Sequence, residues 1–251
     1  MSLQGQHALV TGGGTGIGLA IARALAGAGA AVTITGRRAN VLDEAGDIHG
    51  LTPVMMDVTV EASIVNAIQA ASRAHGPITI CVANAGIAEG RALQKTELSF
   101  WRRIMQTNLD GAFLTIRECL QGMRNAQWGR VIAVASIAGV RGLKGAPAYT
   151  ASKHGLVGLI RGLSEDYLGT GITFNALCPG YTDTDIVLQN SESIAQRAGI
   201  SPEAAREMMQ SANRHGRLID PAEVAAAALW LCEPGSESVN GQTIEIAGGQ
   251  A

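Results

Sequence analysis

A glycine-rich turn joins the first predicted strand to the first predicted helix, and it limits the possible folds more than any other feature. The turn reads Thr11-Gly12-Gly13-Gly14-Thr15-Gly16-Ile17-Gly18, between an aliphatic run at 7–11 and a helical pattern at 16–28. Glycine lets the backbone approach a bound group closely, and a helix amino terminus offers unpaired N–H groups with a favourable dipole. The turn therefore predicts a site for the pyrophosphate of a dinucleotide, although glycines alone would also fit a merely flexible loop.

Short aliphatic runs alternate with longer segments of helical period along the chain. Strands without strict polar alternation indicate a parallel sheet whose two faces are both covered by helices. The sequence therefore predicts a single-domain, doubly wound α/β Rossmann fold with about seven strands. We expect strands at 7–11, 31–35, 52–56, 78–83, 131–136, 172–177 and 243–246, and helices at 16–28, 60–75 and 97–121.

Residues 185–216 differ from the rest in being polar and helix-prone. Met208 and Met209 stand together there, and Pro202 follows Ser201 at a predicted helix start. Long excursions from a compact domain often carry function, so we interpret this segment as a lid over a substrate site. An ordinary surface helical hairpin is the alternative.

Composition and charge exclude several other classes of protein. The net charge of −2 offers no field of one sign to attract nucleic acid or an anionic membrane. No stretch reaches the roughly 18 apolar residues of a membrane span, and no secretory leader is recognisable, so we expect a cytoplasmic protein. The four cysteines are widely spaced and the five histidines show no metal-ligand spacing, so we expect reduced thiols and no metal site.

The spacing TGxxxGxG, filled by Thr11, Gly12, Gly16 and Gly18, resembles the short-chain dehydrogenase/reductase family in its classical form. The resemblance covers essentially the whole chain. It implies hydride transfer between a nicotinamide cofactor and a carbonyl or secondary alcohol, and a homotetramer built through the helices that follow the fourth and fifth strands. The cofactor-binding residues expected from the turn and the resemblance are Gly12, Gly14, Thr15, Gly16, Ile17, Gly18, Arg37, Arg38, Asp57, Val58, Asn84, Ala85, Gly86, Tyr149, Lys153, Pro179, Gly180, Thr182 and Thr184.

Within this set the resemblance implies several separate roles. Asp57 contacts the adenine edge, and Asn84-Ala85-Gly86 matches the NAG motif that supports both the sheet and the cofactor. The turn after the sixth strand matches the family's PGxxxT pattern, in which Thr184 binds the nicotinamide carboxamide.

The end of the second strand bears on the choice between NAD and NADP. A carboxylate there would accept hydrogen bonds from the ribose 2′-hydroxyl but repel a 2′-phosphate. This chain has Gly36, Arg37 and Arg38 instead, and guanidinium groups pair well with phosphate. The pattern favours NADP(H), although arginines at a helix start are also often solvated or stacked on adenine.

Tyr149 and Lys153 are the candidate proton-handling pair. They stand four residues apart, on one face if the run into Leu168 is helical. A free phenol has a pKa near 10, and we expect the lysine cation and the positive nicotinamide to lower it. Ser136 is expected at the end of the fifth strand, at the sheet edge where ligands of open α/β folds bind. Its hydroxyl and that of Tyr149 could stabilise an oxygen that gains negative charge as hydride arrives.

The resemblance adds Asn108 as the fourth member of an Asn-Ser-Tyr-Lys set, where it holds a water that relays protons through lysine. From the sequence alone, Asn108 could equally be a helix-interior asparagine bonded to its own backbone.

The substrate is less well defined by the sequence. The lid and the segment 213–231 are similar to those of family members that act on hydroxyacyl-CoA or hydroxybutyrate, which favours a 3-oxoacyl or 3-hydroxyacyl substrate over other ketones, alcohols or sugars. Arg91, Arg141 and Lys144 could anchor a carboxylate or a CoA phosphate, or could simply be solvated loop charges. A non-catalytic nucleotide-binding regulator is disfavoured because Ser, Tyr and Lys are all present. A sugar-nucleotide epimerase is disfavoured because the chain lacks room for a second domain and has a different turn spacing.

Overall fold

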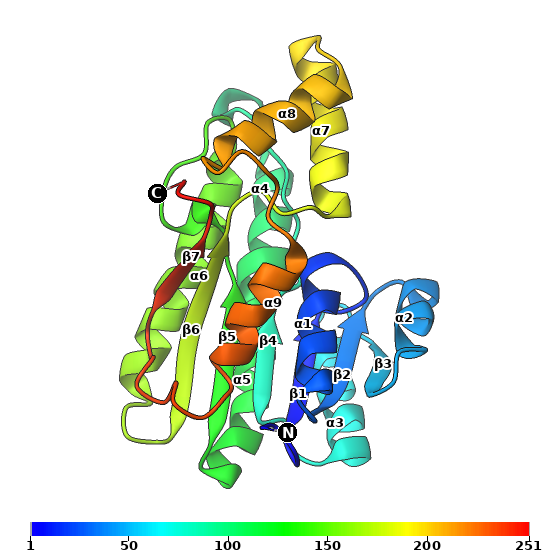
Figure 1. Ribbon diagram of the computed structural model, residues 1–251, viewed down its shortest axis with the longest axis vertical. Coiled ribbons are helices and arrows are strands. Elements are labelled where there is room, and N and C mark those ends of the chain that lie inside the picture. Colours follow the sequence, from blue (N-terminus) through cyan, green and yellow to red (C-terminus); the bar gives the residue numbers. More distant parts are fainter. Residues whose placement is uncertain (1, 251) are drawn as a thin grey trace.

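The computed structural model describes residues 2–250, and over these residues seven strands form one parallel sheet (Figure 1). The strand order is β3-β2-β1-β4-β5-β6-β7, so the chain starts in the middle of the sheet and winds outward in both directions. The topological switch point lies between β1 and β4, where ligands of open α/β sheets bind. The strands are β1 His7–Thr11, β2 Ala31–Gly36, β3 Leu51–Met55, β4 Ile80–Ala83, β5 Gly129–Val134, β6 Ile172–Pro179 and β7 Thr243–Ile246.

Helices cover both faces of this sheet. Helices α1, α2 and α9 pack on one face, where α1 and α9 are neighbours. Helices α3, α5 and α6 pack on the other face. The bounds are α1 Gly16–Gly27, α2 Ala39–Gly46, α3 Glu61–His75, α4 Leu98–Met105, α5 Gly111–Ala126, α6 Pro147–Asp166, α7 Asp185–Ala198, α8 Pro202–Ala212 and α9 Pro221–Trp230. Neighbouring residues of β1 serve different faces, because Ala8 and Val10 join the core beneath α1 while Leu9 joins the core beneath α5. This two-sided burial explains why the strands read as continuous apolar runs.

The fold prediction is confirmed, with differences at particular elements. The expected helix 97–121 is two helices, α4 and α5, separated by a π-helical turn at Gln106–Asp110. Helices α2 and α9 were not predicted, and they are short, with eight and ten residues. Strand β5 ends at Val134, so Ser136 lies two residues beyond the strand rather than at its end.

The segment 185–216, expected to be a lid or a surface hairpin, is a helical hairpin that projects beyond the carboxyl edge of the sheet (Figure 1). Its second helix starts as predicted: Pro202 is the first helical residue, and the Ser201 hydroxyl accepts a hydrogen bond from the Ala204 N–H at 3.1 Å. Among residues 2–250, no helix is both long and apolar enough to cross a membrane. The four cysteines are buried free thiols.

A buried histidine, His7, joins neighbouring segments at the amino-terminal edge of the sheet, which is the edge opposite the carboxyl ends of the strands. His7 is 1 % exposed, its Nδ1 lies 2.9 Å from the Gly76 carbonyl oxygen, and its Nε2 lies 2.9 Å from Thr33 Oγ1. A carbonyl only accepts, so Nδ1 carries the proton and Nε2 accepts from the hydroxyl of Thr33. Burial, partly opposed by the Gly76 hydrogen bond and reinforced by His75, lowers the pKa of His7 below 6.5.

This arrangement makes folding stability depend on pH. Below about pH 6.5 the unfolded chain binds a proton that the folded His7 resists, so stability falls as pH decreases through that value. We expect the drop in Tm between about pH 7.5 and about pH 5.5 to be smaller in His7→Asn than in the unmodified protein. The exposed His49 provides the control, since His49→Asn should retain the full drop. An unchanged pH dependence in His7→Asn would contradict this account.

Candidate active site

The glycine turn lies at the carboxyl end of β1 and is closely packed. Gly12 has φ +63°, a conformation that side chains disfavour. A Cβ on Gly18 would collide with the Gly12 carbonyl oxygen and lie 2.5 Å from Asn84 Nδ2. Any side chain at position 18 would therefore push the turn away from the helix that follows it.

The amino terminus of α1 has the form that a pyrophosphate needs. Thr15 is the N-cap residue, but its hydroxyl makes no capping hydrogen bond, and the first N–H groups of a helix have no partners within the helix. Gly16 has φ +52°, and a Cβ there would lie 3.1 Å from Cγ2 of Thr184. Residues that are 168 positions apart in the chain thus meet beside these free donors, and the cradle fits a dinucleotide phosphate.

Asn84 ties the end of β4 to the turn. Its Nδ2 donates to the carbonyl oxygens of Thr11 at 2.8 Å and Gly12 at 3.2 Å. The backbone N–H groups of Asn84 and Ala85 both donate to the Thr11 hydroxyl at 2.9 Å. The predicted supporting role of the Asn84-Ala85-Gly86 motif thus corresponds to four hydrogen bonds that join the two central strands.

The expected adenine end of the site lies at β2 and β3. Arg37 and Arg38 are exposed, and Arg37 reaches Asp57 with 4.0 Å between Nη1 and Oδ2. Although burial raises the pKa of Asp57, hydrogen bonds from Thr59 and the charge of Arg37 produce a net lowering, so the carboxylate stays ionised. Val58 is packed in the core.

Ser136 and Tyr149 meet at the carboxyl edge of the sheet. Ser136 is buried, and its hydroxyl oxygen accepts from the Ala138 N–H at 3.1 Å, which leaves its proton free to donate. Burial raises the pKa of Tyr149, and this effect outweighs a hydrogen bond from Ser136 that lowers it. The phenol therefore keeps its proton at neutral pH in the protein alone.

The ammonium group of Lys153 has a backbone partner that was not predicted. Its Nζ donates to the Val134 carbonyl oxygen at 2.9 Å and lies 5.9 Å from the centroid of the Tyr149 ring. Burial lowers the pKa of Lys153 to about 8. Without a cofactor, burial raises the pKa of Tyr149. The lowering of this pKa by Lys153 together with the positive nicotinamide stays a prediction.

Asn108 sits in the π-helical turn and is 1 % exposed. Its Oδ1 accepts from the Ile87 N–H at 2.8 Å, and its Nδ2 donates to the Ile87 carbonyl at 2.9 Å and to Ser152 Oγ at 3.1 Å. The Ser152 hydroxyl in turn donates to the Tyr149 carbonyl at 2.8 Å. The side chain of Asn108 thus holds the loop after β4 against α6, and this answers the alternative that it bonds only its own helix.

The turn after β6 carries the remaining predicted residues. Gly180 N–H donates to the Ile246 carbonyl at 3.0 Å, and the buried Thr182 donates to the Gly180 carbonyl at 3.2 Å. Thr184 is the N-cap of α7, and its hydroxyl donates to the Thr182 carbonyl at 3.3 Å.

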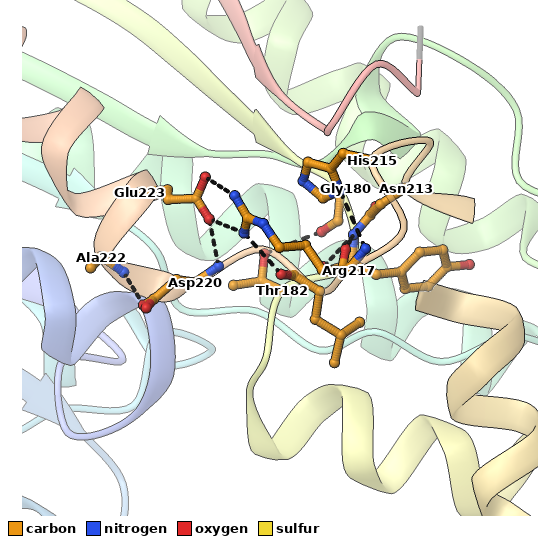
Figure 2. A network of polar contacts seen from close by, with 10 residues as sticks. Gly180, Thr182, Asn213, His215, Arg217, Asp220, Ala222 and Glu223 are labelled. Carbon is orange, nitrogen blue, oxygen red and sulfur yellow. Dashed lines mark hydrogen bonds and ion pairs between the residues drawn. The ribbon is translucent and has the colours of Figure 1, made fainter. Parts of the chain in front are cut away.

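Asn213, which was not among the residues predicted for the site, holds this turn in place (Figure 2). Asn213 is 0 % exposed, accepts from the Tyr181 N–H at 3.2 Å, and donates at 2.8 Å to the carbonyls of both Tyr181 and Arg217. Arg217 then pairs with Glu223, whose carboxylate also caps α9 through the Asp220 N–H. No local sequence pattern identifies this role, because the Tyr181 backbone that Asn213 binds lies 32 positions away.

Known proteins share both the sequence and the structure of this chain. The family model "short chain dehydrogenase" matches residues 6–195. D-beta-hydroxybutyrate dehydrogenase of Cupriavidus necator is 35% identical over 77% of this chain and 75% of its own length. The 3-oxoacyl-acyl-carrier-protein reductase FabG of Salmonella typhimurium is 33% identical over 99% of this chain and 98% of its own length.

A solved structure agrees with the fold as well. A variant of actinorhodin polyketide ketoreductase, crystallised with NADPH, superposes with a TM-score of 0.93 at 33% identity, covering 98% of this chain and 97% of that one. With the glycine turn, the parallel sheet and the Ser-Tyr-Lys arrangement in place, the chain belongs to the short-chain dehydrogenase/reductase family in its classical form, as a nicotinamide-dependent oxidoreductase.

Proposed function

We propose that the protein reduces the keto group of a 3-oxoacyl compound with NADPH, using Ser136, Tyr149 and Lys153. The observation that carries this proposal is the partly buried phenol of Tyr149 beside the hydroxyl of Ser136, with a pKa raised by desolvation so that the phenol keeps its proton. A proton donor at that position suits reduction, since the carbonyl oxygen gains negative charge and must be protonated.

The bound nicotinamide supplies or accepts the hydride. Ser136 and Tyr149 hydrogen-bond the substrate oxygen, and they bind it more strongly as it becomes an alkoxide than in the ground state. Tyr149 then gives its proton to that oxygen. Lys153, whose Nζ donates to the Val134 carbonyl, would bind the ribose hydroxyls of the cofactor, and Asn108 holds the loop after β4 against α6, the helix that carries Lys153.

The substrate class is supported by the relatives. Their names include a ketoacyl reductase, a 3-oxoacyl reductase and a D-beta-hydroxybutyrate dehydrogenase, and the last two names specify an oxygen on the third carbon of an acyl chain. The direct test is a panel of 3-oxoacyl thioesters, 3-oxo acids, simple ketones and sugars, followed at the absorbance of reduced nicotinamide. Cofactor binding without turnover across this panel would refute the proposal.

NADPH is proposed as the preferred cofactor because Arg37 and Arg38 follow β2 and no carboxylate stands at that strand end. We expect Arg38→Met to lower kcat/KM for NADPH by about 10-fold while the value for NADH changes little. Arg73→Met, on the exposed side of α3, is the matched control and should change neither value. Equal losses with both cofactors would show that Arg38 does not contact the 2′-phosphate.

Two further assignments are part of the proposal. The hairpin α7–α8 acts as the substrate lid, since it starts directly at Thr184 and stands over the carboxyl edge of the sheet. A homotetramer forms through α5 and α6, which is supported by the 44 % exposure of Phe113 on α5. Sedimentation of the purified protein tests the tetramer.

A further inference from the structure

Three cations in loops near the active site have different surroundings. Arg91 lies over the ring of Phe100, 4.2 Å from its guanidinium carbon to the ring centroid. Lys144 is exposed. Arg141 is partly buried, and its Nε is fully enclosed by protein but has no hydrogen-bond partner. Among residues 2–250, Arg141 also forms no ion pair with a carboxylate.

The loop that carries Arg141 is fixed between the two proton donors of the site. At one end, the Arg141 N–H donates to the Ile137 carbonyl at 3.1 Å, next to Ser136. At the other end, the Leu143 N–H donates to Thr150 Oγ1 at 3.3 Å, next to Tyr149. The position of Arg141 is therefore set by the same elements that set the catalytic hydroxyls.

Tyr181 is the second residue, after Arg141, that concerns this part of the site. Burial raises the pKa of Tyr181 and the positive charge of Arg141 lowers it, which places the guanidinium within electrostatic reach of the phenol. Tyr181 in turn raises the pKa of Tyr149 through an electrostatic interaction. Tyr181 follows β6, which pairs with the β5 strand that leads to Ser136, so Arg141, Tyr181 and Tyr149 lie at the same carboxyl edge of the sheet. Within the described residues 2–250, no carboxylate forms an ion pair with Arg141.

We propose that Arg141 and Tyr181 form a subsite for the substrate, and that its ligand is the free carboxylate of a small 3-oxo acid. An enclosed, unpaired guanidinium N–H is unfavourable unless a ligand accepts from it, and a carboxylate matches the donor fork of arginine. The phosphates of CoA are a pantetheine chain away from the reacting carbonyl, whereas the carboxylate of a 3-oxo acid is two bonds away. This subsite rests on the proposed function, because it lies beside the same reacting carbonyl.

The test compares acetoacetate with acetoacetamide, which has nearly the same shape but no charge. With NADPH, we expect the unmodified protein to prefer acetoacetate. Arg141→Gln should lower kcat/KM for acetoacetate by about 30-fold or more and change that for acetoacetamide by less than about 3-fold. Arg141→Lys should recover part of the loss, and Tyr181→Phe should show a smaller loss, again only with the acid. Lys144→Met, three residues away in the same loop, is the control and should behave as the unmodified protein.

Three results would overturn the subsite. Equal losses with acid and amide in Arg141→Gln would show that Arg141 only supports the loop. Equal use of acid and amide by the unmodified protein would show that no carboxylate is recognised. A loss confined to acetoacetyl-CoA, with phosphate-free acetoacetyl-pantetheine unaffected, would identify a CoA phosphate as the anion.

A binding measurement separates this proposal from the proposed function. Calorimetry of 3-hydroxybutyrate with the NADP⁺ complex should show binding that is weakened in Arg141→Gln and unchanged in Lys144→Met. A protein that reduces 3-oxoacyl thioesters but neither binds nor reduces 3-oxo acids refutes the carboxylate subsite alone. Absence of turnover with every carbonyl refutes the proposed function, while the calorimetry still decides whether Arg141 binds the carboxylate.

Discussion

Replacing Tyr149 with phenylalanine is expected to lower kcat by about 100- to 10,000-fold while the affinity for NADPH stays nearly unchanged. The change removes only the phenolic oxygen. That oxygen receives the hydrogen bond from Ser136, and burial keeps its proton in place at neutral pH. The substrate oxygen would lose both a hydrogen-bond donor and its proton source, at the step in which negative charge develops.

Steady-state kinetics measure kcat, and fluorescence titration measures the affinity for NADPH. Tyr167→Phe is the matched control, because Tyr167 lies at the end of the same helix and packs on Phe174 with ring centroids 5.3 Å apart, outside the site. It should retain the normal rate. If Tyr149→Phe retained a rate within a few-fold of normal, Tyr149 would not be the proton donor.

Gly18→Ala is expected to have the largest effect on the glycine turn. The added methyl group would collide with the Gly12 carbonyl oxygen and lie 2.5 Å from Asn84 Nδ2. The backbone of the turn and the side chain of Asn84, which binds that backbone, must therefore both move. Overpacking of this kind costs about 1–3 kcal/mol of the free energy of unfolding. NADPH affinity should fall as well, because the displaced groups include the donors at the start of α1.

Gly27→Ala is the control within the same helix. A Cβ on Gly27 meets nothing within 4 Å, so this change should leave stability equal or raise it by about 0.4–1 kcal/mol. Urea unfolding and NADPH titration of both variants make the comparison. Equal stability of the two variants would mean that the turn tolerates a side chain at position 18 and that the packing at Asn84 is not what fixes it.

Much of the fold could be predicted because its signals are local. The strands of the sheet show as aliphatic runs, and the cap at Ser201 and Pro202 follows from two adjacent residues. Where local pattern and tertiary contact disagree, prediction failed. The apolar period runs on through 97–121, yet the helix changes to a π turn where Asn108 binds Ile87 in the loop after β4.

The sequence by itself determined the order of strands and helices, the glycine turn, and the Ser136, Tyr149 and Lys153 set, since hydrophobic period and residue spacing act over short stretches of chain. Only the tertiary structure decided the state of those groups. Lys153 binds the Val134 carbonyl, Asn213 holds the turn after β6, and burial raises the pKa of Tyr149. Each of these three features depends on contacts or burial that arise only when distant segments of the chain pack together. The glycine turn therefore predicted a dinucleotide site from the sequence, whereas the protonation of the catalytic groups beside it depends on the folded structure.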